Sequence, residues 1–449
     1  MRFTSISLAL AGTLAALPPA ALFAGCRYLA ESDTIQVSDY TLDVPCTPGI
    51  LLRMDRMNDW GKVAYDSTAD TYRVSADLQI GNNDGTATFF QLGSAEHPNE
   101  TLLVRGNVVI HPCFVKGDDA PRCAATPPVN RLTLGSPTNP AIRAALKIDS
   151  EPGRERTLFC GAAPRIAQWG AQGGELHVYN GLITAASPDP GHSFGAMDPV
   201  QRSGPHVVLR GSVVLDHAVV AWFKGVALWS ADSRQVRATD TVFEHGDYAA
   251  CNSNTPWDLR RCIFRDLGVA LADWGGAFRG TLTDCVFTNN AVNWKLATPD
   301  AHLICVDCDF DDSPARKRYG AFADDGGGKL KPPTFTSQRH VIVEAVDAAG
   351  SPLAGAAVRI ACEQNVWEDT VFNGKAVTGP SGRTPGPGAA DAVLMTEYQE
   401  TATAAADAPR RTDFSYSVTV STPGGKTASV KGFRPRSSWE VLRVPPAEH

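Results

Sequence analysis

Four copies of a short motif recur at nearly constant spacing in the middle of the chain. Each copy is a phenylalanine preceded, two residues earlier, by a threonine or a cysteine, and the copies are Thr241–Phe243, Cys262–Phe264, Cys285–Phe287 and Cys308–Phe310. The four phenylalanines lie 21, 23 and 23 residues apart. A period of this length is typical of a solenoid, in which each repeat forms one coil. Because alternate residues of a strand face the same side, we predict a ladder of stacked phenylalanines inside the coils, next to a ladder of threonine and cysteine.

The residues around these motifs favour strands over helices. The stretches 103–110, 177–183 and 207–215 each place β-branched and other apolar residues on both sides of a glycine, and turn residues separate the stretches. No window of 12 or more residues after the first 25 carries the apolar stripe of an amphipathic helix. Three short strands in a repeat of about 22 residues fit a parallel β-helix better than a leucine-rich repeat, whose leucine spacing is missing. The sequence therefore predicts an all-β solenoid.

Residues 206–313 resemble the right-handed parallel β-helix proteins of the pectate-lyase-like superfamily. The resemblance rests on the run Cys285–Asn290, on weaker copies at 241–246 and 262–268, and on Gly225–Leu228. It implies a fold and leaves the activity open, because this fold carries lyases, hydrolases, esterases and non-catalytic adhesins. The Asn-Thr-Asp motif of the polygalacturonase-type hydrolases of this superfamily is absent.

Composition and strand patterns divide the chain into five parts. They are a signal peptide over 1–25, an N-terminal β module over 26–100 that caps the solenoid, the parallel β-helix over 101–320, a linker over 321–338 and a β-sandwich over 339–449. The cap is expected because an open solenoid end exposes unpaired strand edges.

The last part resembles the small β-sandwich domains akin to the carboxypeptidase regulatory domain. The stretch Val346–Val358, with its Gly-x-Pro-Leu-x-Gly-Ala core, carries the resemblance, and Thr378–Gly382 and Tyr416–Val420 match a second turn and a later strand of that family. The resemblance implies a spacer or binding module without catalytic residues.

Charge and the first residues indicate an exported protein. The net charge is −7 and the pI is near 5.8, so no basic surface favours nucleic acid. An apolar stretch from Ile6 to Leu17 follows Met1–Arg2 and leads into small residues, the order of a secretory signal peptide. Pro18–Pro19 interrupts the apolar run, which argues against a membrane span. The expected location is outside the cytoplasm, either secreted or as a lipoprotein of the outer membrane or cell surface.

Two interpretations fit the end of this leader. Ala24–Cys26 resembles the lipobox of bacterial lipoproteins, which implies that Cys26 is acylated, becomes the first residue of the mature chain and gives its only membrane contact. Alternatively, the leader is cleaved near Ala24 and Cys26 pairs with another cysteine, such as Cys46. The lipoprotein is favoured because setting Cys26 aside leaves an even number of the 11 cysteines for pairing in an oxidising compartment.

Charged residues occupy the outward positions of the coils. Three positions before each phenylalanine stand Asp240, Arg261, Asp284 and Asp307, and one position after it stand Glu244, Arg265, Thr288 and Asp311. Stacked strands lie about 4.8 Å apart, so charges in one column are near neighbours. One interpretation is an ion ladder, in which Asp240–Arg261–Asp284 and Glu244–Arg265 pair across coils and keep the face soluble.

The other interpretation is a groove for a uronic-acid polymer. Lyases of this fold abstract a proton next to a carboxylate, which requires a base and also cations that neutralise the carboxylate. The candidate catalytic residues are Glu244, His245, Asp247, Asp266 and Lys295. The candidate substrate-binding residues are the cations Arg261, Arg265 and Arg279, together with Trp274 and Trp294, which either stack on sugar rings or pack in the core.

Two further clusters suggest metal sites. Asp307, Asp309 and Asp311 alternate along the last coil and are candidate calcium ligands, since Ca²⁺ takes roughly six to eight oxygens. The basic run Arg316–Arg318 is the competing partner for these carboxylates. Cys305–Cys308 has the spacing of a zinc or redox motif, but the inward position of the repeated cysteines favours disulfides or buried thiols.

These observations lead to two functional hypotheses. The first is an exported enzyme on an acidic polysaccharide, with a lyase as the preferred reaction. The second is a non-catalytic, surface-anchored β-helix that binds a glycan or a partner protein through its outer face. Acid and base residues on neighbouring coils favour the first.

Overall fold

The described part of the chain is built almost entirely from β-strands. The computed structural model describes residues 25–81, 87–111, 130–152, 156–160, 174–193, 212–231, 235–253, 257–273, 279–323, 330–364 and 375–444. These residues include one α-helix, α1 (Pro48–Asn58), and two 3-10 helices, Ala30–Ser32 and Pro314–Arg316. The strands belong to four sheets, and pairing within the three larger sheets is mostly parallel. The prediction of an all-β chain is confirmed at this level.

Three large sheets form the body of the molecule. The first contains β1 (Cys26–Leu29), β2 (Thr34–Val37), β5 (Asp77–Ile80), β8 (Val108–Ile110) and β11 (Leu158–Cys160). The second contains β3 (Val63–Asp66), β4 (Thr71–Val74), β7 (Thr101–Val104), β10 (Ala145–Ile148), β13 (Leu182–Ala185), β15 (Val219–Ala231), β17 (Val242–Ser253), β19 (Ile263–Asp273), β21 (Val286–Thr288), β22 (Val292–Leu296) and β24 (Lys317–Tyr319). The third contains β6 (Phe89–Leu92), β9 (Arg131–Leu134), β12 (Glu175–Tyr179), β14 (Ser212–Asp216), β16 (Gln235–Thr239), β18 (Trp257–Arg260), β20 (Arg279–Thr283), β23 (His302–Val306), β25 (Thr334–Ala345), β28 (Val393–Thr401), β29 (Arg410–Asp413) and β32 (Glu440–Val444).

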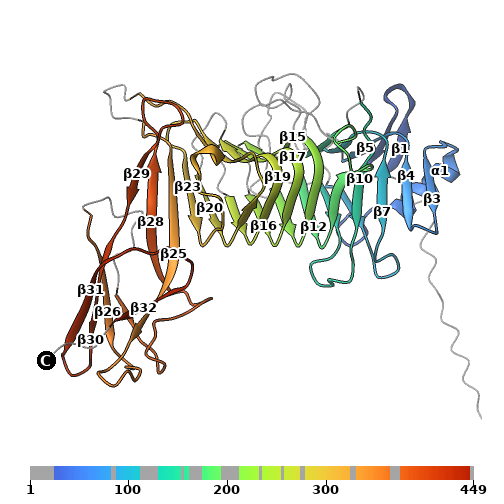
Figure 1. Ribbon diagram of the computed structural model, residues 1–449. Helices are drawn as coiled ribbons and strands as arrows, with labels where there is room; N and C mark the ends of the chain where they lie inside the picture. Colours follow the sequence, from blue (N-terminus) through green and yellow to red (C-terminus); the bar gives the residue numbers. More distant parts are fainter. Residues whose placement is uncertain are drawn as a thin grey trace, which may run out of the picture.

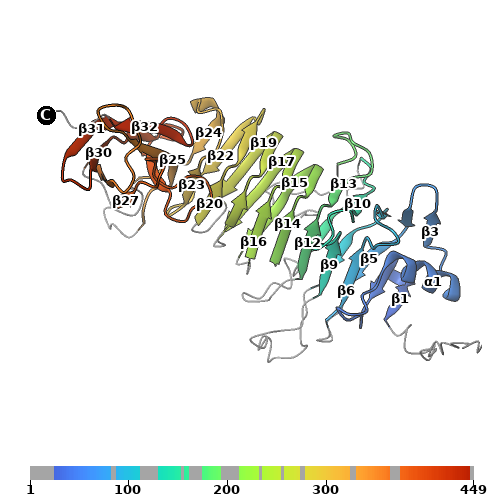
Figure 2. The same cartoon turned by 90° about the horizontal axis from the view of Figure 1, so that it is seen from below.

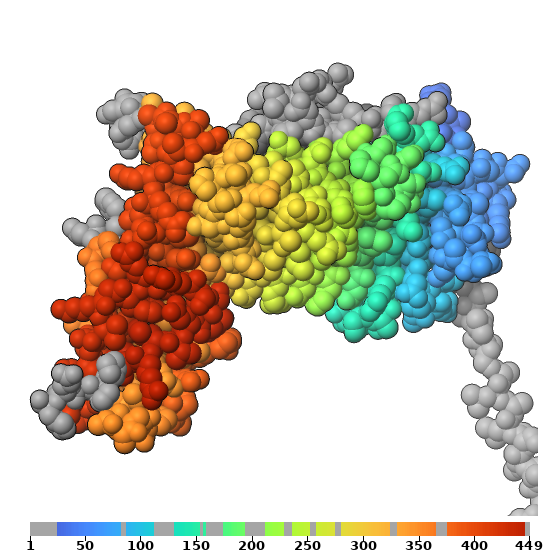
Figure 3. All heavy atoms as spheres, in the orientation of Figure 1, coloured from blue at the N-terminus to red at the C-terminus, as the bar shows by residue number. Residues whose placement is uncertain are grey.

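Successive strands from β5 to β13 visit these sheets in rotation, and those from β14 to β20 alternate between the third and second sheets. β5, β6 and β7 lie in the first, third and second sheets, and β8 to β10 and then β11 to β13 repeat that order. Each strand pairs in parallel with its counterpart in the next round, as β12 does with β14 and β17 with β19. Figures 1 and 2 show the rounds stacked along one long axis, and in Figure 3 the sequence colours follow that axis as bands. This arrangement is compatible with a β-helix or another solenoid-like fold.

The phenylalanine ladder lies in the core of the stack, as the spacing predicts. Phe243, Phe264 and Phe287 are direct partners in the register of β17, β19 and β21. The ring centroids of Phe243 and Phe264 are 5.3 Å apart, and those of Phe264 and Phe287 are 4.9 Å apart, with nearly parallel planes. Phe310 meets Phe287 edge-on at 6.4 Å, so the stacking ends at the fourth member.

The cysteine ladder runs beside the phenylalanines. Cys262, Cys285 and Cys308 are buried free thiols. Each thiol donates a hydrogen bond to a backbone carbonyl of the preceding coil, over 3.4 to 3.6 Å. Burial raises the pKa of the Cys308 thiol well above its ordinary value. The cysteines therefore fill the core as neutral side chains, one of the two structural roles that the sequence favours.

Parallel pairing reaches further toward the N-terminus than the sequence predicts. β2 pairs with β5, β4 with β7, and β6 with β9, so strands within residues 26–100 already belong to the three sheets. The helix α1 lies at this end of the stack and buries Leu51 and Met54. Thr47 caps the helix because its hydroxyl accepts a hydrogen bond from the Ile50 N–H.

β25 runs from the stack into the C-terminal part of the chain. Thr334–Gln338 pair in parallel with β23, and Val341–Ala345 pair in parallel with β32. Part of the range expected as a linker, 321–338, is therefore a strand fixed in the third sheet.

The C-terminal part has its own core between two facing sheets. One is the end of the third sheet, and the other is the four-stranded sheet of β26 (Ala357–Cys362), β27 (Lys375–Val377), β30 (Tyr416–Ser421) and β31 (Thr427–Phe433). Val343, Tyr416 and Val418 are among the buried residues that fill the space between these sheets.

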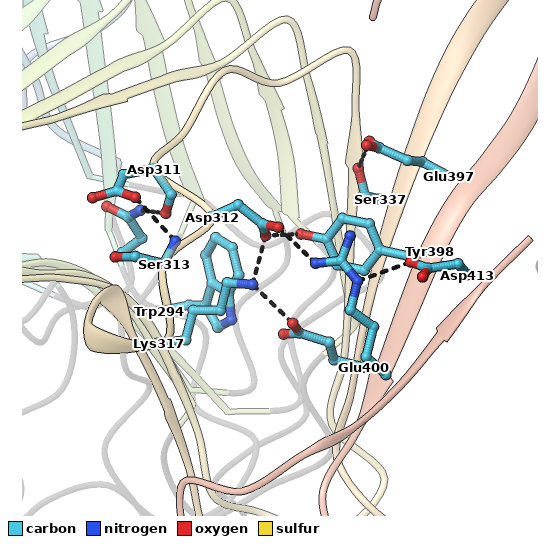
Figure 4. A network of polar contacts seen from close by, with 12 residues as sticks. Trp294, Asp311, Asp312, Ser313, Lys317, Ser337, Glu397, Tyr398, Glu400 and Asp413 are labelled. Atoms are coloured by element: carbon cyan, nitrogen blue, oxygen red, sulfur yellow. Dashed lines mark hydrogen bonds and ion pairs between the residues drawn. The ribbon is translucent and has the colours of Figure 1, made fainter. Parts of the chain in front are cut away.

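A buried polar cluster closes the stack where it meets β28. The Lys317 Nζ lies 2.6 Å from the Asp312 carboxylate and 2.8 Å from the Glu400 carboxylate. Figure 4 shows Lys317 between these two carboxylates. The side chains of Lys317 and Glu400 are 4% and 7% exposed. The Tyr319 hydroxyl donates a further hydrogen bond to Glu400 over 2.6 Å. Every charge in this junction therefore has an opposite charge or a hydrogen-bond donor beside it.

Aromatic rings surround the Lys317 ammonium group. It lies 5.5 Å from the centre of the Trp294 ring and 5.4 Å from that of Tyr398. Trp294 is completely buried and donates from its Nε1 to the Tyr319 hydroxyl over 3.2 Å. Trp294 therefore packs in the core and is not available to stack on a sugar ring.

Truncating the central ring of the ladder tests the core. We expect Phe287→Ala to lower the free energy of unfolding by about 3–5 kcal/mol, because it opens a cavity between two stacked coils. Urea unfolding of the purified protein measures this, with the exposed neighbour variant Thr288→Ala as the control. A loss below about 1 kcal/mol would contradict the buried ladder.

Replacing Lys317 tests whether its buried ion pair stabilises the C-terminal end of the stack. Lys317→Met leaves Glu400 buried without its counter-charge, so we expect a loss of about 3–5 kcal/mol in the free energy of unfolding. The double variant Lys317→Met/Glu400→Gln should recover most of that loss. Arg318→Ala is the control, since among the described residues Arg318 donates to backbone carbonyls and to no carboxylate. Equal stability of Lys317→Met and wild type would show that the pair contributes nothing.

Candidate functional site

Two columns of left-handed residues border the strands of the second sheet. The first column, where third-sheet strands turn into second-sheet strands, has φ values of 50–54° and consists of Asn180, His217, Asp240, Arg261, Asp284 and Asp307. The second column, at the bends of β15, β17 and β19 and after β21, has φ values of 54–57° and consists of Trp222, His245, Asp266 and Asn289. Asn and Asp adopt this conformation more readily than other non-glycine residues. Residues of one column lie on successive coils, about 4.8 Å apart.

Two of the cations that were candidates for binding an acidic substrate already form ion pairs with carboxylates of the protein. Arg261 donates two hydrogen bonds of 2.7 Å to the Asp240 carboxylate. Arg265 donates to Glu244 over 2.6 Å. The predicted pairs Asp240–Arg261 and Glu244–Arg265 are confirmed, and both guanidinium groups are already neutralised. The third rung of the predicted ladder is not formed, because Asp284 makes no ion pair with Arg261.

One trio of potential metal ligands lies on the first column. Ligand atoms of Asp216, His217 and Asp240 all lie within 4.8 Å of one another, and this is the one such group among the described residues. His217 directs its Nδ1 to Asp216 at 2.9 Å and its Nε2 to Asp240 at 3.7 Å. The imidazole thus bridges two carboxylates, and Arg261 holds Asp240 from the next coil. The trio is an extension of the ion ladder.

The second column holds two of the five predicted acid–base residues, His245 and Asp266, and a third, Asp247, lies two residues after His245. The His245 ring stacks on Trp222 with centroids 4.4 Å apart. Asp266 lies one coil further on and accepts a hydrogen bond from the Asn289 amide. The Asp247 carboxylate accepts a backbone N–H of the preceding coil over 2.9 Å. The structure therefore brings His245, Asp247 and Asp266 to one edge of the second sheet. We call these three residues, together with Trp222, the edge column.

The remaining candidates lie elsewhere. Lys295 is exposed on β22 beside Ala272, beyond the bend and away from the edge column. Trp274 falls outside the described residues. Arg279 begins β20, and its side chain is likewise outside the described part.

The three candidate calcium ligands do not converge. Asp307 turns inward, where it accepts the His340 backbone N–H over 2.9 Å and lies 2.5 Å from the His340 Nδ1. Burial raises the pKa of Asp307, but the His340 hydrogen bonds outweigh burial and the net shift is downward. Asp311 accepts the Ser313 N–H over 2.9 Å, and Asp309 is exposed on an isolated bridge. The expected shared calcium site is therefore not formed by these residues.

A cluster that the sequence analysis overlooked lies on the outer face of the third sheet. Glu175, His177 and Tyr179 alternate outward along β12, while Leu176 and Val178 between them are buried in the core. The signal was present in the sequence as ionisable residues with a period of two inside a predicted strand.

His177 links the acid to the phenol. Its Nε2 lies 3.4 Å from the Glu175 Oε2, and its Nδ1 lies 3.4 Å from the Tyr179 hydroxyl. Because an ionised carboxylate only accepts, the ring proton belongs on Nε2, and Nδ1 is left to accept from the phenol. Arg131 on the neighbouring strand β9 donates from its Nε to the same Glu175 oxygen over 2.7 Å. We call Glu175, His177 and Tyr179 the strand relay.

A cation without an ion-pair partner among the described residues lies on the same face. Arg237 on β16 is exposed, and no carboxylate of the described residues lies within ion-pair distance of it. The register places it in the column of His177, two strands away, with Val214 between them. Two strand spacings are about 10 Å. Arg237 thus differs from Arg261 and Arg265, whose charges are already matched.

The surroundings set the protonation of the relay. The hydrogen bond from His177 lowers the pKa of Glu175, and Arg131 adds to this effect against burial. Burial raises the pKa of Tyr179. At neutral pH the relay therefore starts as an ionised acid and a neutral phenol.

The lowered pKa of Glu175 gives a stability test. Its carboxylate stabilises the fold above the ordinary pKa of 4.5, and this contribution disappears as the pH falls through the lower folded-state value. We expect Glu175→Gln to be less stable than wild type at pH 7 and equally stable near pH 2. Denaturant unfolding across this pH range measures the difference, with the exposed Glu96→Gln as the control. A deficit that stays constant with pH would contradict the lowered pKa.

No family model, curated protein or solved structure matches this chain. Among the described residues, no helix is both long enough and apolar enough to cross a membrane.

Proposed function

We propose that the three stacked sheets form a right-handed parallel β-helix of the pectate-lyase-like kind. The rotation of strands β5 to β13 through three sheets, the parallel pairing that continues beyond them and the inward phenylalanine ladder support this architecture. The handedness follows from the preference of parallel crossover connections, about 98% of which are right-handed. In the same proposal, the C-terminal pair of sheets is a carboxypeptidase-regulatory-like β-sandwich that serves as a spacer or binding module.

We infer that the protein is exported and acts as a lyase on an acidic polysaccharide. The observation that carries this proposal is the strand relay on the outer face of the third sheet. A phenol backed by an imidazole and a carboxylate is an acid–base device of the same logic as a nucleophile–histidine–acid triad. The leader over 1–25 supports export.

The relay suits a β-elimination. Tyr179 gives its phenol proton to His177, and Glu175 stabilises the resulting imidazolium. The phenolate takes the proton from the carbon next to the uronate carboxylate. The electron pair of that C–H bond forms a double bond as the bond to the glycosidic oxygen breaks. The phenol then passes the proton to the leaving oxygen, and His177 returns its own proton to Tyr179.

Arg237 supplies the charge that this reaction needs. Proton abstraction builds negative charge on the substrate carboxylate. Arg237 stabilises that charge from two strands away, with a guanidinium that has no ion-pair partner among the described residues. Arg261 and Arg265 would first have to leave their carboxylate partners.

A second candidate function is non-catalytic glycan binding at the edge column. The stacked pair of Trp222 and His245 favours it, because aromatic faces bind sugar rings and the neighbouring Asp247 and Asp266 offer hydrogen-bond acceptors. This interpretation needs no acid–base chemistry.

Substitution at the relay tests the lyase. We expect wild-type protein to release unsaturated uronate, detected by absorbance, from at least one of a panel of uronic-acid polymers. Tyr179→Phe should lower the rate about 10²–10⁴-fold, the usual contribution of a general acid–base group. Tyr28→Phe, which removes a hydroxyl at the N-terminal end of the stack, is the matched control.

The same assay distinguishes the strand relay from the edge column as the site of the reaction. A rate that survives Tyr179→Phe but falls in His245→Ala or Asp247→Ala would move the reaction to the edge column. Binding of the polymers without any unsaturated product, lost on Trp222→Ala, would support the non-catalytic function instead.

A further inference from the structure

The first strand of the structure brings two cysteines together in the core. Cys26 begins β1, Cys46 lies just before α1, and their Sγ atoms are 3.8 Å apart. Cys26 is 8% exposed and Cys46 is 0% exposed. The Tyr40 hydroxyl lies 3.4 Å from the Cys26 Sγ and covers the pair from one side. Both thiols therefore face each other away from solvent.

Main-chain pairing holds both cysteines in place. Cys26 is the antiparallel partner of Val37 in the hairpin of β1 and β2. The Cys46 N–H donates to the Phe89 carbonyl over 2.9 Å, and the Cys46 carbonyl accepts the Gln91 N–H over 2.8 Å. Moving either residue to the surface would break these bonds.

The distance between the sulfurs is short enough for a covalent bond. A disulfide bond is about 2.05 Å long, so the sulfurs have to approach by less than about 2 Å. Rotation about χ1 moves each sulfur without moving the paired backbone.

We propose that Cys26 and Cys46 form a disulfide in the mature protein, which leaves Cys26 without an acyl chain. An acylated Cys26 would have to direct its sulfur into a membrane, whereas the structure directs it into the core against Cys46. Of the two interpretations of the leader, the structure thus favours cleavage and pairing. This inference rests on the proposed function at one point, because export is what places the protein in an oxidising compartment.

The bond forms by two thiol–disulfide exchanges with a small or protein disulfide as the oxidant. A hydrogen bond from Cys46 lowers the pKa of Cys26, so Cys26 ionises more readily. Its thiolate attacks the oxidant, forms a mixed disulfide and releases one thiolate. Cys46 then loses its proton and attacks the Cys26 sulfur, which releases the second thiol. Two protein thiols and one disulfide become one protein disulfide and two thiols.

Peptide mapping tests the bond on the whole chain. The protein is expressed with its own leader, purified without reductant, alkylated under denaturing conditions and digested for mass spectrometry. We expect a linked Cys26–Cys46 peptide that separates on reduction. Reduction should lower the thermal midpoint by roughly 5 °C or more, because the bond closes the loop from residue 26 to residue 46. Cys362→Ala, which alters a thiol of the C-terminal part, should retain the linked peptide.

A second arm distinguishes this inference from the proposed export. Chain made without its leader, reduced and then treated with oxidised glutathione, should form the same linked peptide even if the protein is not exported. Cys46→Ala should leave Cys26 open to alkylation, and reduction should no longer lower its midpoint. An acyl group on Cys26, or alkylation of both cysteines after glutathione treatment, would overturn the proposal.

Discussion

Parallel main-chain hydrogen bonding between successive rounds of the chain decides where every side chain of the stack lies. Once β17, β19 and β21 are in register, their phenylalanines must fall on top of one another, and the residues beside them must form columns on the outside. A shift by one residue would turn the ladder outward and bury the charges that now face solvent. The apolar ladder and the charged columns are therefore two consequences of one register.

The same register decides which charges remain available to a ligand. In the first column of left-handed residues, Asp240 and Arg261 lie on successive coils. They neutralise each other at a distance set by the strand spacing. On the outer face of the third sheet, Val214 separates His177 from Arg237, and the guanidinium group keeps its charge exposed. A column interrupted by an apolar residue can therefore present a charge that a continuous ion ladder would cancel.

Sequence reasoning captured the repeats and missed features that depend on distant pairing. The period of the phenylalanines was sufficient for the inward ladder, because burial and register follow from local alternation. The N-terminal limit of the parallel stack was not visible, since β2, β4 and β6 are short and carry no repeated motif. The burial of Trp294 and the turning of Asp307 toward His340 depend on β25 and β28, which arrive from far along the chain. The strand relay was visible as an alternation, but only the register showed that Arg131 supports it.

A flat strand face suits a proton relay because its geometry needs no loop to hold it. Side chains two residues apart on one strand leave the sheet about 6.6 Å from each other, and an imidazole between them reaches both neighbours with its two nitrogens. Glu175, His177 and Tyr179 use this spacing, with the buried Leu176 and Val178 anchoring the strand from below. The edge column lacks that arrangement, because its residues come from different coils and its carboxylates already accept amide or backbone hydrogen bonds. Pre-organisation is therefore greater on the face than on the edge, and this difference is the physical reason for proposing acid–base chemistry on the third sheet.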